Sequence, residues 1–182
     1  MINNLIMNFD FVGKCDITEI KKTVSEMDEH LWKKHTLRQT LTKPHTNTET
    51  IELIWDFESL NNLLKGKEHE ELYSLKIDKF LESIYPLYYE KYGKGTFVRV
   101  LLVKLKKLSK IKPHIDSGIG LEIAKRTHLA IITNDLVKFT VNNETKNLKE
   151  GDIWEIDNQL EHSVENDSEI DRIHLIIDYY VS

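Results

Sequence analysis

Short runs of β-branched and aromatic residues follow one another closely through the second half of the chain, and this pattern restricts the fold more than any other feature. Turn-forming residues separate the runs, for example at Asn134-Asp135 and Asn142-Asn143. Runs of this kind between turns are typical of strands. Seven or eight strands at such close spacing indicate a sandwich, a jelly roll or a barrel. The predicted strands cover residues 97–105, 111–115, 127–133, 136–141, 153–156, 162–164 and 173–181.

The first half of the chain mixes helix and strand patterns. We predict one short strand over residues 5–12 and another over residues 48–55, where apolar and polar residues alternate. Residues 16–34 open on a capping-box sequence and predict an amphipathic helix. A second helix is expected over about 68–84, and Pro86 should end or kink it.

Length and composition favour one domain. The chain is 40% hydrophobic, which is enough for one sizeable core, and its 182 residues are too few for two typical domains. We therefore expect a single α+β unit, mainly β, that occupies residues 1–182. Its jelly-roll core would span residues 96–182, and the helices of residues 1–95 would buttress one face of that core.

The charge and the cysteine count restrict partners and location. Thirty acidic and 25 basic residues are interspersed and give a net charge of −5, so neither nucleic acid nor a membrane surface is an expected partner. A small-molecule or peptide substrate fits better. Cys15 is the single cysteine, and the chain begins without the layout of a signal peptide, so we expect a cytoplasmic protein. Nothing in the sequence indicates an oligomeric state.

Arginine is scarce in this chain. Only four of the 25 basic residues are arginine, namely Arg38, Arg99, Arg126 and Arg172, and the others are lysine. An arginine retained against this bias indicates a need for the planar guanidinium, which can hold a carboxylate through two parallel hydrogen bonds. The lysines at 104, 106 and 107, in contrast, are interpreted as an exposed strand end.

Two arginines belong to Arg-x-His motifs on predicted strands, Arg126 with His128 and Arg172 with His174. Chance would give about 0.2 such motifs in a chain of this composition. Residues i and i+2 of a strand point to the same side, so each motif presents a cation and an imidazole together. This arrangement suits the binding of a dicarboxylate.

A metal site is predicted from His114, Asp116 and His162. His114 and Asp116 are two residues apart on a predicted strand, and His162 follows 48 residues later on another. Two histidines and one carboxylate occupy one face of an octahedron, leave three positions open and suit Fe(II). A second pair of this spacing, His69 and Glu71, lies at a predicted helix start, where residues two apart do not share a face, and we interpret it as solvated.

The segment from residue 97 to residue 180 resembles the aspartyl/asparaginyl β-hydroxylase family of Fe(II)- and 2-oxoglutarate-dependent oxygenases. The stretches that carry the resemblance are residues 112–116, 126–129, 143–146 with 150–151, 161–164, and 172–175 leading to Asp178. They cover nearly half of the chain in the family's order. The resemblance implies a double-stranded β-helix, or jelly roll, in agreement with the predicted strands.

The resemblance also implies roles for individual residues. His114, Asp116 and His162 would bind the iron, and Arg172 would hold the far carboxylate of 2-oxoglutarate. Arg126 and His128 would help to bind the same cosubstrate, with His174 beside them, and O2 would take the remaining position at the metal. In the N-terminal half, which should set substrate selectivity, we expect Trp32 and Arg38 to contact substrate.

The expected function is hydroxylation of an unactivated C–H bond. The substrate implied by the resemblance is the β-carbon of an aspartyl or asparaginyl group, in a peptide, a protein or a free amino acid. Alternatives are a hydroxylase of another free amino acid such as proline, or of a lipid-linked acyl chain, and a non-catalytic jelly-roll module that binds metal or a dicarboxylate. A cupin-like metal isomerase is disfavoured because it would not need Arg172.

Overall fold

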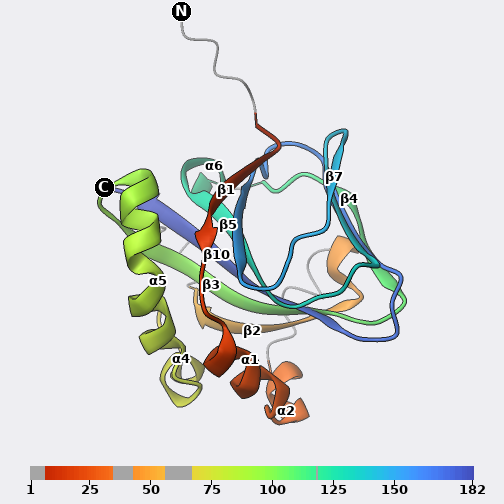
Figure 1. The fold of residues 1–182 in the computed structure, drawn as a ribbon, viewed down its shortest axis with the longest axis horizontal. Coiled ribbons are helices and arrows are strands. Elements are labelled where there is room, and N and C mark those ends of the chain that lie inside the picture. The colour runs from red at the N-terminus through yellow and green to blue at the C-terminus, as the bar shows by residue number, and fades with distance from the viewer. Residues whose placement is uncertain (1–6, 35–42, 56–66, 118) are drawn as a thin grey trace, which may run out of the picture.

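The computed structural model describes residues 7–34, 43–55, 67–117 and 119–182 (Figure 1). Two antiparallel sheets form the core, one of six strands in the order β1-β8-β5-β10-β3-β2 and one of four in the order β4-β9-β6-β7. The larger sheet consists of β1 (Phe9–Lys14), β8 (Asp152–Ile156), β5 (Lys125–Ile132), β10 (Arg172–Val181), β3 (Gly95–Leu105) and β2 (Thr48–Ile54). The smaller sheet consists of β4 (Ser109–His114), β9 (His162–Asn166), β6 (Val137–Val141) and β7 (Glu144–Lys146).

The two sheets face each other across an apolar layer. Phe9, Leu105 and Ala130 from the larger sheet pack in one buried cluster with Phe139 and Val164 from the smaller sheet. This arrangement confirms the predicted jelly roll. The predicted strands lie where expected to within two residues, except that β1 is shifted toward the C-terminus and that β7 was not predicted.

Helices cover the other face of the larger sheet. Figure 1 shows α1 (Thr18–Ser25), α2 (Glu29–Trp32), α4 (Glu70–Ser74) and α5 (Ile77–Tyr92) along one side of that sheet, away from β4 and β7. Their buried residues, among them Val24, Ile84 and Tyr88, form one cluster with Leu102 and Leu175 of the sheet. The predicted buttress is therefore present. No helix in the described part of the chain is long and apolar enough to cross a membrane.

Both predicted helices differ from the structure in their boundaries. The first breaks after Ser25, and α2 begins anew because the Asp28 side chain accepts a hydrogen bond from the backbone N–H of His30 at 2.8 Å. The second breaks at Lys76, which is left-handed with φ 56°, and α5 then continues through Pro86 to Tyr92. Pro86 does not end the helix, because Ile84 and Tyr88 on either side of it are buried against the sheet.

Two charged residues are more buried than the sequence suggested. Lys104 lies only 4.5 Å above the Trp32 ring and forms ion pairs with Glu29 at 3.0 Å and Glu49 at 2.9 Å. The interpretation as an exposed strand end is therefore wrong for Lys104, although Lys106 and Lys107 are exposed. In the predicted solvated pair, the Glu71 side chain is buried and contacts Lys34 at 2.5 Å. In both cases contacts with residues distant in sequence, and not the local charge pattern, determine how far the side chain is buried.

The larger sheet presents polar residues to its inner face. On β10, Ile173, Leu175 and Ile177 belong to the helix-side core, so that Arg172 and Asp178 point the other way, toward the smaller sheet. Arg126 and His128 alternate in the same manner on β5. Buried cations and imidazoles therefore line the space between the sheets.

Gly95 allows the C-terminal end of β10 to pack closely on β3. A Cβ there would clash with the backbone oxygen of Tyr180 and would lie 2.6 Å from the Tyr179 ring, which is buried against Tyr88 and Phe97. We expect Gly95→Ala to lower the free energy of unfolding by about 1–3 kcal/mol, as overpacking does. Urea unfolding measures this. The exposed Lys94→Ala serves as control and should change stability by less than about 0.5 kcal/mol; equal stability of the two variants would contradict the packing argument.

Candidate active site

Strand pairing brings the three predicted metal ligands together. His114 ends β4, His162 begins β9, and the two residues lie directly opposite each other in this antiparallel pair. Asp116 follows two residues beyond the end of β4. Its Oδ1 lies 3.7 Å from His114 Nε2 and its Oδ2 lies 3.8 Å from His162 Nε2. The three ligand atoms lie within 4.8 Å of one another, so one ion could contact all of them.

Both histidines are oriented in the same way. Nδ1 of His114 donates to the backbone oxygen of Lys112 at 2.8 Å, and Nδ1 of His162 donates to that of Leu160 at 3.0 Å. Because a carbonyl can only accept, Nδ1 carries the proton and the Nε2 lone pair is left for a metal. Burial lowers the pKa of His162, which favours the neutral form that binds metal. These donors fit Fe(II).

A buried ion network holds the carboxylate ligand. Arg126 donates through Nε and Nη2 to the two oxygens of Asp178, each at 2.8 Å, and through Nη1 to Oδ2 of Asp116. Burial alone would lower the pKa of Arg126, but the charges of Asp178 and Asp116 outweigh it and raise that pKa. Arg126 therefore remains a cation and fixes the orientation of Asp116. Its predicted role in cosubstrate binding stays a prediction.

The loop before β9 holds the backbone of the same ligand. The N–H of Asp116 donates to the backbone oxygen of Asn158 at 3.1 Å, and the Gln159 side chain donates to the backbone oxygen of Asp116 at 3.3 Å. The Asn158 side chain also donates to the backbone oxygen of Leu121 at 3.0 Å. Leu121 lies in the short helix α6 (Ile119–Ile123). The segment that carries Asp116 is therefore tied to the one that leads into His162.

The second Arg-x-His motif forms a buried polar group farther from the metal ligands. The Arg172 side chain is only 1% exposed, and its Nη2 donates to Nδ1 of His174 at 2.6 Å. Its guanidinium carbon lies 5.8 Å from the centre of the Phe139 ring. Burial lowers the pKa values of His128 and His174 well below the usual range, and the charge of Arg172 lowers them further. Arg172 is thus the cation of a group whose two imidazoles are neutral.

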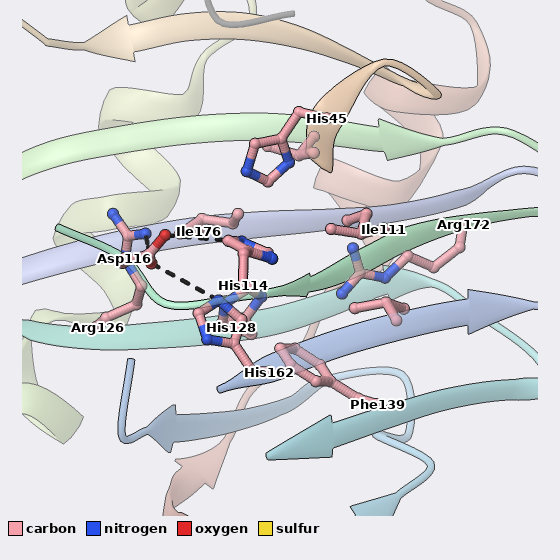
Figure 2. Close-up of a pocket in the computed structure, with 12 residues that line it drawn as sticks. His45, Ile111, His114, Asp116, Arg126, His128, Phe139, His162, Arg172 and Ile176 are labelled. Atoms are coloured by element: carbon pink, nitrogen blue, oxygen red, sulfur yellow. Dashed lines mark hydrogen bonds and ion pairs between the residues drawn. The ribbon is translucent and has the colours of Figure 1, made fainter. Parts of the chain in front are cut away.

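The three candidate metal ligands line one pocket between the two sheets together with Arg126, His128 and Arg172 (Figure 2). In Figure 2, Asp116 lies toward one end of the lining and Arg172 toward the other. Most of the remaining lining is apolar and consists of Val103, Ile111, Phe139, Val164 and Ile176.

Of the two predicted substrate residues, the structure places only Trp32, and Trp32 does not line this cavity. Trp32 is buried on the helix side of the larger sheet, beneath Lys104, with 3% of its surface exposed. Arg38 lies outside the described residues. Sequence reasoning also missed His45, whose ring lies 5.0 Å from that of His114, and gave no role to Asp178. The spacing of Asp178, six residues after Arg172 on one strand, places both on one face and was a usable signal.

Comparison with known families agrees with this geometry. A profile of the aspartyl/asparaginyl β-hydroxylase family matches residues 14–181. The chain belongs to this family. Membership confirms the resemblance seen in the sequence, extends it into the N-terminal half and makes the chain an oxidoreductase of the hydroxylase class. No curated protein matches the sequence.

Solved structures share the fold. An oxidoreductase of the 2OG-Fe(II) oxygenase family from Burkholderia pseudomallei is 14% identical with a TM-score of 0.59, over 73% of this chain and 67% of that one. A prolyl hydroxylase from Trichoplax adhaerens is 14% identical with a TM-score of 0.60, over 97% and 84%. The epimerase SnoN from nogalamycin biosynthesis is 11% identical with a TM-score of 0.62, over 97% and 79%. At such low identity these likenesses show the fold alone.

His114→Ala removes one of the three ligand atoms. We expect the affinity for Mn(II), a stand-in for Fe(II) that resists oxidation in air, to fall by more than about 100-fold, since loss of an outer-shell partner alone costs 10–100-fold. Calorimetric titration at neutral pH measures this. The matched control is His30→Ala, because His30 is exposed on α2. Equal affinities of the two variants would show that His114 is not a ligand.

Proposed function

We propose that this protein is an Fe(II)- and 2-oxoglutarate-dependent dioxygenase that hydroxylates an unactivated C–H bond. The observation that carries the proposal is one cavity with His114, Asp116 and His162 toward one end and the buried cation of Arg172 toward the other. His114, Asp116 and His162 hold the iron. Three coordination positions remain, enough for a bidentate cosubstrate and O2.

Arg172 is the residue that binds the far carboxylate of 2-oxoglutarate. Its guanidinium has a fixed plane, because Nη2 is bonded to His174 and the Phe139 ring lies beneath the carbon. A planar fork held in this way can take a carboxylate through two parallel hydrogen bonds. His174 acts as a positioning residue, and the His128 ring lies 5.8 Å from the His174 ring. Arg126, the other arginine of the predicted pair, acts chiefly by holding Asp116.

The chain's own contribution is binding, orientation and exclusion of water. When bound, iron with 2-oxoglutarate and O2 supplies the oxidising power, and the balanced reaction converts the C–H bond, O2 and 2-oxoglutarate into an alcohol, succinate and CO2. The apolar residues Val103, Val164 and Ile176 keep the cavity poor in water. Arg126 holds the Asp116 carboxylate in place as a metal ligand.

The proposed substrate is the β-carbon of an aspartyl or asparaginyl group, in a peptide or a free amino acid. Family membership supports this choice. The alternative is hydroxylation of another free amino acid such as proline. A non-catalytic module that binds a dicarboxylate differs in a measurable way, because it would bind 2-oxoglutarate without forming succinate.

Arg172→Lys tests the cosubstrate site, since it keeps the charge and loses the fork. Loss of one charge-assisted hydrogen bond costs about 1.5–3 kcal/mol, so the apparent KM for 2-oxoglutarate should rise roughly 10- to 100-fold. Succinate formation at varied 2-oxoglutarate concentration gives this value. Lys138→Gln, which alters an exposed cation on β6, is the control. An unchanged KM would remove Arg172 from the site.

The wild-type protein should form succinate only with Fe(II), and mass spectrometry should find a product heavier by one oxygen atom among aspartyl and asparaginyl peptides and free amino acids. A chelator-treated sample corrects for background oxidation. Binding of 2-oxoglutarate without succinate across the panel would favour the non-catalytic alternative.

A further inference from the structure

A third arginine, beside Asp178, reaches the inner face of the larger sheet. Arg99 lies on β3 directly opposite Asp178 of β10, and its Nη1 is 3.5 Å from Asp178 Oδ2. Arg126 already takes both oxygens of Asp178 at 2.8 Å. Asp178 therefore pairs mainly with Arg126, and its contact with Arg99 is long for a hydrogen bond.

The guanidinium of Arg99 is incompletely satisfied. Its Nε is buried and has no hydrogen-bond partner among the residues that the structure describes. Burial lowers the pKa of Arg99, and the attraction of Asp178 does not restore it, whereas the pKa of Arg126 is raised. Arg99 is half-buried, with 16% of its side chain exposed, and a cation that is largely removed from water and weakly paired is costly for the folded protein. A ligand with an anionic group would complete the pairing of the Arg99 guanidinium and offset this cost.

Trp55 orients this guanidinium. The guanidinium carbon of Arg99 lies 5.2 Å from the centre of the Trp55 ring, a cation–π arrangement. Trp55 in turn packs against the buried cluster that contains Val103 and Ile176, and both of these residues line the metal cavity. Arg99 is therefore linked through Trp55 to the wall of the cavity that Val103 and Ile176 form.

Contacts place Arg99 toward the metal end of this wall, since it is linked through Asp178 and Arg126 to Asp116. Arg172, at the other end, already provides the cation for 2-oxoglutarate in the proposed function. Arg126 already uses its planar fork on Asp178. Arg99 is a further planar fork in a chain that mostly uses lysine, and it suits a further planar anion.

We propose that Arg99, oriented by Trp55, binds a carboxylate of the substrate. This inference rests on the proposed function and deepens it, because it requires an acidic group on the substrate at this position where a neutral amide would not serve. The carboxylate can come from an aspartyl side chain or from the α-carboxyl group of a free amino acid, and the test separates these two sources.

Arginine Nε–H signals in a nuclear magnetic resonance spectrum provide a readout that does not depend on turnover. A sample labelled with ¹⁵N-arginine has only four such groups, and Arg99→Lys and Arg172→Lys assign two of them by loss of a signal. The protein is loaded with Zn(II), which is diamagnetic, and then with 2-oxoglutarate. The first addition of cosubstrate should shift the Arg172 signal.

Three matched probes then follow. The α-amide of L-aspartic acid has only the side-chain carboxylate, L-asparagine has only the α-carboxylate, and L-aspartamide has neither. We expect one of the two acids to shift the Arg99 signal in a saturable manner and L-aspartamide to leave it in place. The acid that acts identifies the source of the carboxylate. If neither acid shifts the Arg99 signal, or if L-aspartamide shifts it equally, the inference is wrong.

Arg99→Gln gives a second measurement. The affinity for the active acid, followed through the Arg172 signal or by calorimetry, should fall at least about tenfold, as expected for loss of a charge-assisted hydrogen bond. Lys138→Gln should leave that affinity within twofold of wild type. A response of the Arg172 signal to 2-oxoglutarate shows that the variant is folded. Unchanged affinity in folded Arg99→Gln would overturn the inference.

The two proposals fail in different ways. If 2-oxoglutarate does not shift the Arg172 signal and no succinate forms, the proposed function is wrong. If 2-oxoglutarate shifts Arg172 while neither acid shifts Arg99, the cosubstrate site stands and only the substrate subsite is wrong.

Discussion

The contact between Arg126 and the carboxylates of Asp116 and Asp178 is the interaction on which the site depends. It joins the segment after β4 to β5, where Arg126 follows Asp116 by 10 residues, and to β10, where Asp178 follows Arg126 by 52 residues. All three side chains are largely removed from water, so each charge needs the others. The network therefore fixes one oxygen of the carboxylate ligand before any metal binds.

The two faces of the larger sheet explain why this network is possible. The face toward the helices is apolar and supplies the main core, in which Leu102, Leu129 and Leu175 are fully buried. Burial of that apolar core stabilises the fold. The inner face can therefore carry charged groups, although their burial costs free energy. The smaller sheet then covers the charged face and contributes His114 and His162.

Much of the fold was predictable because strands with one polar and one apolar face have a local signature. The alternation along β5 and β10, and the motif of His114, Asp116 and His162, could be recognised without a structure. Features that depend on tertiary contacts could not be predicted from the sequence. The continuation of α5 through Pro86 follows from burial against the sheet, and the burial of Lys104 follows from its position over Trp32.

The pairing of charges was also beyond local reasoning. The cosubstrate role expected of Arg126 stays a prediction, but its bonds to Asp116 and Asp178 were not expected. They follow from strand register, which sets β10 against β5 with Asp178 opposite Arg126. Arg99 shares Asp178 for the same reason from the other side. Scarcity of arginine identified these residues as unusual, but only the register shows which partner each one has.

The affinity of Asp178→Asn for Mn(II) tests the role of the ion network most directly. Loss of this carboxylate frees Arg126 and leaves an uncompensated cation beside the metal, and both effects should weaken metal binding, by roughly 10- to 100-fold for an outer-shell partner. Asp167→Asn, which alters an exposed carboxylate, should bind as wild type does. Wild-type affinity in folded Asp178→Asn would contradict the account.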